Sequence, residues 1–237
     1  MTVFGANGGT GAAAVEHALA AGHAVTAVTR HPEQLGRTHE RLTVRRGDAT
    51  VPADVRAAID GADAVLSALG VPYSRAPITL YSRSGRCIVD AMSEAGVRRL
   101  VVVSSSAVDP DGFPAAGPVD RLIGRYVIGP IVHRLGRTMY EDMLRMEGII
   151  RASGLDWTIV RPPALFDREA AGPTEVSLQP MTGRFVSRQD LAAIMLEEAV
   201  GAEHIARTLY VRSIGGRPSI ARTIWEDGIR TRGSRSG

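Results

Sequence analysis

Three glycines near the start of the chain have a spacing that could bind a phosphate group. Gly5, Gly8 and Gly11 lie in the run GANGGTG, between the apolar residues TVF and the alanine-rich run AAAVEHALAAG. A strand, a glycine turn and a helix start in this order bring backbone amides and the positive end of a helix dipole to a pyrophosphate. The residues between the glycines join the predicted cofactor-binding set: Asn7, Gly9 and Thr10.

The spacing GxxGxxG differs from the dinucleotide fingerprint GxGxxG, so the surrounding unit has to support the prediction. Residues 12–21 predict a helix with Gly22 as its C-terminal cap, and residues 23–30 (HAVTAVTR) predict an apolar, β-branched strand. Together with the first strand they make one βαβ unit. A tight turn without a nucleotide is the alternative, but such a turn seldom needs three spaced glycines.

The end of the second predicted strand bears on the choice of cofactor. Dinucleotide sites that bind NAD(H) place an acidic residue here for the ribose hydroxyls, whereas an arginine accommodates a 2′-phosphate. This strand ends Thr29-Arg30-His31, with no acidic residue before Glu33. Arg30 therefore favours NADP(H), with NAD(H) possible; a plain surface arginine is the alternative.

Further candidate contacts follow the next strands. Asp48, in the run GDAT, suits a contact to the adenine amino group, although an N-cap for the following helix explains it equally well. A small residue at the end of the fourth strand would let a ribose lie against the backbone. These positions complete the adenosine and ribose part of the predicted site: Asp48, Ala49, Ala68, Leu69 and Gly70.

Hydroxyl groups and prolines end the fifth and sixth predicted strands. One hydroxyl among Ser104, Ser105 and Ser106 could donate to a carbonyl or flavin oxygen near a nicotinamide, and we assign Ser105 and Ser106 as catalytic candidates. The alternative is that these serines only satisfy strand-end backbone groups. Pro162 and Pro163 fix a turn that could brace the nicotinamide face.

Strand and helix patterns alternate along the chain, which predicts an α/β, doubly wound parallel sheet of the Rossmann type. Residues 107–136 and 166–186 do not fit the alternation; after late strands they could shape a substrate pocket or form simple surface loops. Strands are expected over 42–48, 62–70, 98–106, 156–165 and 208–213, and helices over 51–61, 78–96, 137–154 and 187–200.

Composition limits the remaining functions. The chain has 237 residues, of which 44% are hydrophobic, as expected for one globular domain. There is no leader pattern and no apolar run that could span a bilayer, so we expect a cytoplasmic protein without a membrane association. With one cysteine, Cys87, we expect neither a disulfide nor a metal site, and the helical pattern around Cys87 favours a buried thiol over a nucleophile.

Every basic residue in the Lys+Arg count of 28 is an arginine. Lysine-dependent chemistry, including a phosphate-binding-loop lysine and a Schiff base, is therefore excluded. Residues 217–237 contain five arginines and two acids, which gives this segment the whole formal charge of +3. We expect a neutral Rossmann domain over 1–216, a basic and flexible tail over 217–237, and no nucleic-acid binding by the fold.

Several motifs together resemble one superfamily. The runs GANGGTG, GDAT, SALG, VVVSSSAV, SGLDWTIVRPPAL and SRQDLAAIML are similar to atypical short-chain dehydrogenases/reductases. The resemblance covers residues 1–213 and is closest to the NAD(P)-binding, NmrA-like branch that includes biliverdin reductase B and NADH-flavin reductases. It implies a Rossmann fold, NADP(H) in the glycine-rich crevice, and either reductase or cofactor-sensing activity.

The chain departs from that superfamily at its Tyr-x-x-x-Lys pair. Counting back from Trp157 puts the pair at Met139 and Met143, with Tyr140 one residue out of register as the remaining catalytic candidate. The resemblance then implies hydride transfer from NADPH to a small conjugated acceptor such as a flavin, a quinone or biliverdin, because such acceptors need no tuned general acid. The alternative is a non-catalytic NADP(H)-binding redox sensor of the NmrA-like type; epimerase or dehydratase activity is disfavoured. The oligomeric state stays open.

Overall fold

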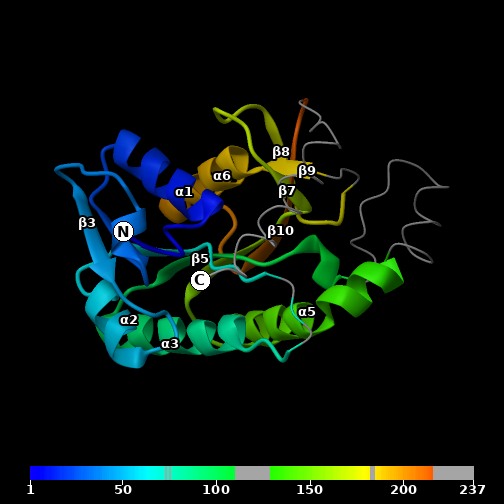
Figure 1. Cartoon of the computed structure of the whole chain (residues 1–237), viewed down its shortest axis with the longest axis horizontal. Helices are drawn as coiled ribbons and strands as arrows, with labels where there is room; N and C mark the ends of the chain where they lie inside the picture. Colours follow the sequence, from blue (N-terminus) through cyan, green and yellow to red (C-terminus); the bar gives the residue numbers. More distant parts are fainter. Residues whose placement is uncertain (73, 75, 110–128, 182–184, 216–237) are drawn as a thin grey trace, which may run out of the picture.

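The chain folds around an eight-stranded sheet that has helices on both faces (Figure 1). The structure is a computed structural model and describes residues 1–72, 74, 76–109, 129–181 and 185–215. The predicted tail, 217–237, lies outside the described residues. The strand order is β3-β2-β1-β4-β5-β6-β10-β8, and every neighbouring pair is parallel except β10 with β8.

Strands and helices alternate through the first half of the chain. The strands of the main sheet are β1 (Thr2–Phe4), β2 (Val25–Thr29), β3 (Leu42–Arg46), β4 (Ala64–Ser67), β5 (Arg99–Val103), β6 (Asp156–Arg161), β8 (Thr174–Ser177) and β10 (Arg207–Ser213). A separate parallel pair consists of β7 (Ala164–Phe166) and β9 (Phe185–Ser187). The helices are α1 (Gly9–Ala20), α2 (Pro52–Ile59), α3 (Leu80–Ala95), α5 (Gly129–Arg151) and α6 (Arg188–Val200), with short 3-10 turns η1 (Pro32–Gln34) and η2 (Ser106–Val108).

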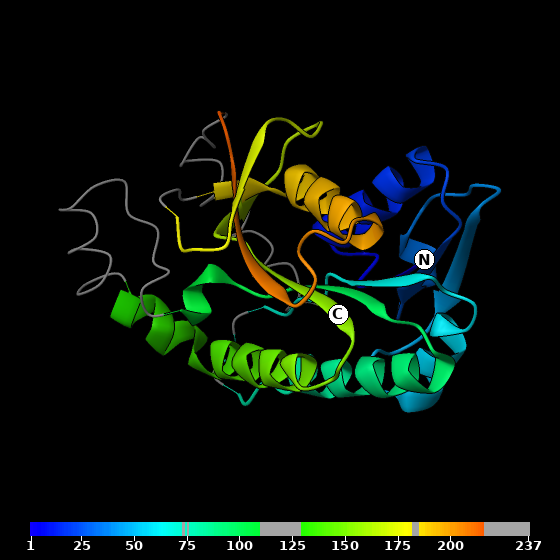
Figure 2. The same ribbon diagram turned by 180° about the vertical axis from the view of Figure 1, so that it is seen from behind.

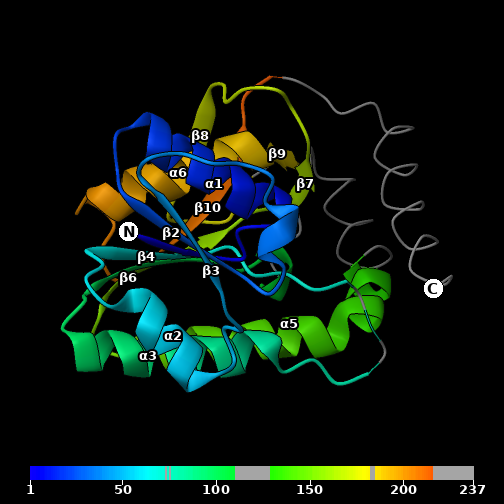
Figure 3. The ribbon, with the colours of Figure 1, turned by 60° about the vertical axis from the view of Figure 1, so that its left-hand side comes forward.

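The sheet has the doubly wound topology that the sequence predicts. The chain runs outward from β1 through β2 to β3, which forms the edge seen in Figure 3, and then returns to β4 on the other side of β1. The strand order thus reverses between β1 and β4. In such a fold, ligands bind outside the carboxyl ends of the strands at this switch point.

Two hydrophobic cores fill the two faces of the sheet. Helices α1 and α6 cover one face, and α2, α3 and α5 cover the other (Figures 1 and 2). Small side chains on α1, such as Ala14 and Ala18, pack with Leu191 and Met195 of α6 in the first core. Because alanine takes little space, α6 can lie close beside α1.

Three expectations need correction. Helix α5 begins at Gly129, not at residue 137, so the last part of segment 107–136 is helical. Segment 166–186 contributes β8, which pairs antiparallel with β10, so the sheet is not wholly parallel. Residues 110–128 and 182–184 of these segments lie outside the described residues. Cys87 is half-buried, not fully buried, and burial raises the pKa of its thiol, which disfavours a thiolate nucleophile.

Helices α3 and α5 are joined by a buried carboxylate. Asp142 of α5 is fully buried and accepts hydrogen bonds from the backbone amides of Tyr81 and Ser82, at 2.8 and 3.2 Å, and from the Ser82 hydroxyl. It thereby caps the N-terminus of α3, whose own N-cap residue, Thr79, makes no side-chain cap. Beside this contact a Cβ on Gly85 would lie 2.9 Å from Met146 Cγ, so the glycine permits close packing.

We expect Asp142→Ala to lower the free energy of unfolding by about 2–4 kcal/mol, because it leaves buried amide donors of α3 without an acceptor. Urea denaturation followed by circular dichroism measures this change. Leu144→Ala, at an exposed position of the same helix, is the control and should change stability by less than about 0.5 kcal/mol. Equal effects of the two substitutions would contradict the role of Asp142.

Candidate functional site

The glycine turn joins β1 to α1 at the switch point of the sheet. Gly5 has a φ of +80°, a conformation that favours glycine, and its carbonyl accepts a hydrogen bond from the Gly8 amide at 2.9 Å. Gly8 is the N-cap of α1 and provides no side-chain cap. The first-turn amides of α1 therefore have neither an intrahelical carbonyl nor a cap, which suits an anion.

The three predicted glycines have different roles. A Cβ on Gly11 would lie 2.1 Å from the carbonyl oxygen of Gly5, and a Cβ on Gly5 would lie 2.6 Å from that of Ala68. Both glycines are thus required by the turn itself, with or without a ligand. Gly8 is exposed, and a Cβ there would meet only the Gly5 carbonyl oxygen, at 3.3 Å, and the Ala68 carbonyl oxygen, at 4.0 Å. Gly8 is therefore the position at which a side chain would obstruct a ligand and not the fold.

The predicted adenosine side lies at the ends of β2 and β3. The Asn7 amide donates to the carbonyl of His31 at 2.8 Å, which ties the glycine turn to the end of β2. Arg30 is exposed, and its carbonyl accepts from Arg46 Nη1 at 2.8 Å. Arg46 and His31 both pair with Glu33, at 3.2 and 3.3 Å. The acid after β2 is therefore engaged with two basic side chains.

Asp48 does not cap the following helix, so that alternative is wrong. Its Oδ1 accepts from the amide and the hydroxyl of Thr50, both at 2.8 Å, whereas the N-cap of α2 is Val51. The hydrogen bond from the Thr50 amide is the main reason that the pKa of Asp48 is lowered, and the positive charge of Arg30 lowers it further. The carboxylate is thus charged near the Arg30 guanidinium, and Ala49 beside it is buried.

The ends of β5 and β6 are bonded to each other. The Ser106 amide donates to the Pro162 carbonyl at 2.9 Å, which fixes the turn before Pro163. Ser105 Oγ accepts a hydrogen bond from the Ala107 amide at 3.2 Å. This hydroxyl therefore satisfies a backbone group at the strand end, which was the alternative to a catalytic role. Ser104 Oγ is different: it is the one buried side-chain polar atom among the described residues that lacks a hydrogen-bond partner.

Tyr140 lies within the core below the sheet. It is 3% exposed, and Met139 and Met143, where counting back from Trp157 predicts the Tyr-Lys pair, are each 7% exposed. All three residues belong to the hydrophobic cluster that includes Val108 of η2. Tyr140 is thus packed in the hydrophobic core among apolar side chains.

Sequence reasoning missed a buried polar network beside Pro162. Arg161 donates to both carboxylate oxygens of Glu147, at 3.0 and 2.7 Å, and its Nη1 donates to the Tyr210 hydroxyl at 2.8 Å. The Tyr210 hydroxyl in turn donates to Asp109 at 2.6 Å. Burial and the bond to Asp109 raise the pKa of Tyr210. The one available signal was an arginine directly before two prolines at a strand end.

Sequence reasoning also missed Arg188, the first residue of α6. A Cβ on Gly9 would lie 2.5 Å from Arg188 Cδ and 3.0 Å from its Nε, so this side chain crosses the first turn of α1. Arg188 Nη1 donates to Asp167 Oδ1 at 2.8 Å. Nothing in the local sequence could have indicated this contact, because Gly9 and Arg188 are far apart along the chain.

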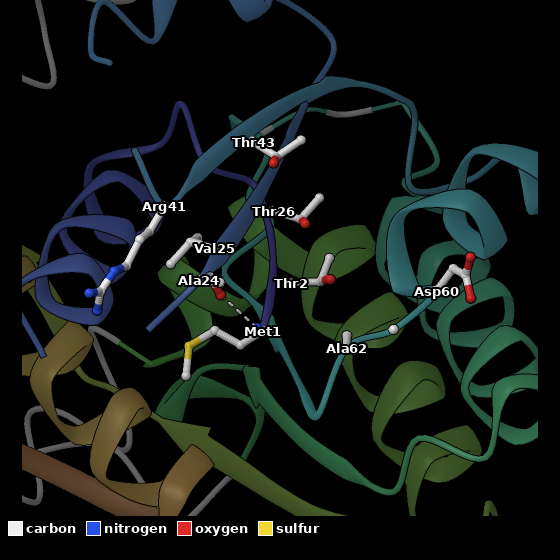
Figure 4. A pocket seen from close by; sticks show the side chains of 10 residues that line it. Met1, Thr2, Ala24, Val25, Thr26, Arg41, Thr43, Asp60 and Ala62 are labelled. Atoms are coloured by element: carbon white, nitrogen blue, oxygen red, sulfur yellow. Dashed lines mark hydrogen bonds between the residues drawn. The ribbon is translucent and has the colours of Figure 1, made fainter. Parts of the chain in front are cut away.

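A small pocket of about 110 Å³ lies at the opposite end of the sheet (Figure 4). Thr2, Thr26 and Thr43 from three neighbouring strands line it, together with Met1, Ala24, Val25, Arg41, Asp60, Gly61 and Ala62. It lies at the amino end of the parallel strands, away from the glycine turn. Within the described part of the chain, no cluster of three or more metal-ligating side chains occurs, and no helix is long and apolar enough to cross a bilayer.

Known proteins resemble this chain in structure or in sequence. A short-chain dehydrogenase/reductase from Veillonella parvula, solved in complex with NADP, is 19% identical, with a TM-score of 0.74 over 92% of this chain and 98% of that one. The oxidoreductase ylbE from Lactococcus lactis is 17% identical, with a TM-score of 0.70 over 95% and 96%. UPF0659 protein C216.03 from Schizosaccharomyces pombe is 27% identical over 86% of this chain and 87% of its own length.

We expect Gly8→Val to abolish NADPH binding while the protein stays folded. The Gly8 backbone, with φ −72° and ψ 153°, is ordinary for valine, but the branched side chain would stand where a pyrophosphate must approach. Titration by NADPH fluorescence and a thermal melt measure the two properties. Gly148→Ala, where a Cβ meets nothing within 4 Å, is the control. A folded Gly8→Val protein with normal NADPH binding would show that the turn is only structural.

A family model covers nearly the whole described chain. The model, described as NAD(P)H-binding, matches residues 5–215, from the first glycine of the turn to just beyond β10. This range includes the glycine turn and every described strand and helix except β1, which ends one residue before the match begins. The protein is therefore a member of the NAD(P)H-binding family with a Rossmann fold.

Proposed function

We propose that the protein is an NADPH-dependent reductase of a conjugated acceptor such as a flavin, a quinone or a bilin, similar to the NmrA-like branch that includes biliverdin reductase B. NADPH would supply a hydride, and the acceptor would then take its proton from water. The protein's part is to bind the two molecules and to orient them face to face.

One observation supports this choice above others. The chain has no lysine, and counting back from Trp157 puts the superfamily's Tyr-Lys pair at Met139 and Met143, which are both buried. Carbonyl reduction needs a proton donor with a tuned pKa, whereas a conjugated acceptor can be protonated at an atom open to solvent. A site without the pair therefore favours the conjugated acceptor.

Residues at the ends of β5 and β6 would orient the reactants. The unpartnered Ser104 hydroxyl has unused hydrogen-bonding capacity, which a cofactor or acceptor group could satisfy after a small shift. Ser105 and Ser106 stand beside it, and Pro162 and Pro163 would support the nicotinamide. Ser105→Ala and Ser106→Ala should each slow turnover, because each raises the activation free energy by about 1 kcal/mol, the contribution of one hydrogen bond.

The proposal is tested by measuring NADPH consumption against a panel of flavins, quinones and biliverdin. Saturable oxidation of NADPH with at least one of these acceptors supports the reductase. Tight NADPH binding without consumption by any acceptor would instead favour a redox sensor. The Gly8→Val protein serves as the blank in each assay.

We expect Tyr140→Phe to lower turnover by less than about tenfold, because a proton from solvent makes a tyrosine donor unnecessary. Turnover is measured with the best acceptor of the panel, and NADPH affinity is measured alongside it. A loss of about 10³-fold with unchanged NADPH affinity would mean that Tyr140 is the proton donor and that the helix register inferred from Trp157 is wrong.

We also expect the protein to prefer NADPH to NADH because of Arg30. Arg30→Ala should weaken NADPH binding by about 1.5–3 kcal/mol, the value of a charge-assisted hydrogen bond to the 2′-phosphate, and should leave NADH binding nearly unchanged. Titrations of both cofactors measure this. Arg56→Ala, which removes an arginine paired with Glu94 at 2.8 Å on the helical face, is the control. Equal affinities of the wild-type protein for NADPH and NADH would contradict the preference.

A further inference from the structure

The arginine that crosses the glycine turn, Arg188, does not stabilise the helix to which it belongs. Arg188 is the first residue of α6, and its side chain is 21% exposed. A cation is unfavourable in the first turn of a helix, because the positive end of the helix dipole lies there. The α6 N-terminus is already capped by Ser187, whose Oγ accepts from the Asp190 amide at 2.9 Å.

The same guanidinium also lies beside the N-terminus of a second helix. The aliphatic part of the Arg188 side chain occupies the place that a Cβ on residue 9 would take, so it fits only because residue 9 is a glycine. The Arg188 guanidinium thus adds a positive charge to the uncapped first-turn amides of α1. Such an arrangement is stabilised by an anion.

An acidic residue already competes for this arginine. Asp167 Oδ1 accepts from Arg188 Nη1, and the Asp167 side chain is 59% exposed. The residues that follow Asp167 are fastened to α6: the Arg168 guanidinium and the Gly172 amide donate to buried Asp190, at 3.1 and 2.6 Å. Asp167 is therefore held within reach of Arg188.

We propose that Arg188 binds the pyrophosphate of the dinucleotide at the N-terminus of α1, and that Asp167 competes with the phosphate for its guanidinium. A guanidinium pairs with carboxylates and phosphates through the same N–H groups, so the two anions oppose each other. Arg188 is then the residue through which α6 closes the phosphate site, and Asp167 sets how tightly the cofactor binds. This inference rests on the dinucleotide site and not on the identity of the acceptor.

The two residues should have opposite effects on NADP⁺ affinity. Arg188→Gln keeps most of the stem but removes the charge, and it should weaken binding about tenfold to a hundredfold. Asp167→Asn removes the competing charge, and it should tighten binding about threefold to fivefold at low salt, less at high salt. Isothermal titration with NADP⁺ measures both, with Arg56→Gln as the matched control.

A double variant tests whether Asp167 acts through Arg188. The gain from Asp167→Asn should be absent in the Arg188→Gln background, because no guanidinium is left to release. Gly9→Ala is a second probe: its Cβ would displace the Arg188 side chain and should weaken binding without changing any charge. A thermal melt of each variant confirms that the fold is retained.

Unchanged NADP⁺ affinity in Arg188→Gln would overturn the proposal. So would an Asp167→Asn protein that binds NADP⁺ more weakly, since the pair would then only shape the site. A full Asp167→Asn gain in the Arg188→Gln background would show direct repulsion by Asp167 and would also overturn it. Failure to consume NADPH with any acceptor affects only the proposed reductase, because these measurements use binding alone.

Discussion

The candidate site depends on how closely the glycine turn approaches strand β4. Gly5 and Gly11 have no room for a Cβ, because the carbonyl groups of Ala68 and Gly5 lie within 2.6 Å of where it would stand. This close approach brings the start of α1 to the carboxyl ends of β1 and β4, beyond which the chain continues to helices on opposite faces of the sheet. The uncapped amides of α1 are thereby held beside the carboxyl ends of the neighbouring strands, where a dinucleotide binds in a doubly wound fold.

Three fully buried carboxylates on helices hold neighbouring elements of the fold together. Asp142 caps α3 from α5, Glu147 pairs with Arg161 at the end of β6, and Asp190 binds the segment after β7. Each buried charge is satisfied by donors from another element. Removing a partner would leave a charge or a donor unpaired inside the protein, so each contact specifies how two elements meet.

Much of the fold could be predicted because its signals are local. A buried strand needs a short apolar run, and a helix end often needs a glycine, so the βαβ order and most boundaries followed from the sequence. The errors lay where distant segments decide. The start of α5 and the existence of β8 depend on contacts with other elements, above all on the antiparallel pairing of β8 with β10.

The sequence by itself determined the glycine turn, the arginine after β2 and the exclusion of any lysine chemistry, since these are matters of residue type and spacing. Only the tertiary structure decided which side chains meet there. It placed Tyr140 in the core and bonded the Asp48 carboxylate to Thr50, so that Asp48 does not cap a helix. It also packed the Arg188 side chain against Gly9. The physical reason is that such contacts are set by the packing of α1 against α6 and of α5 against the sheet, which joins residues far apart along the chain.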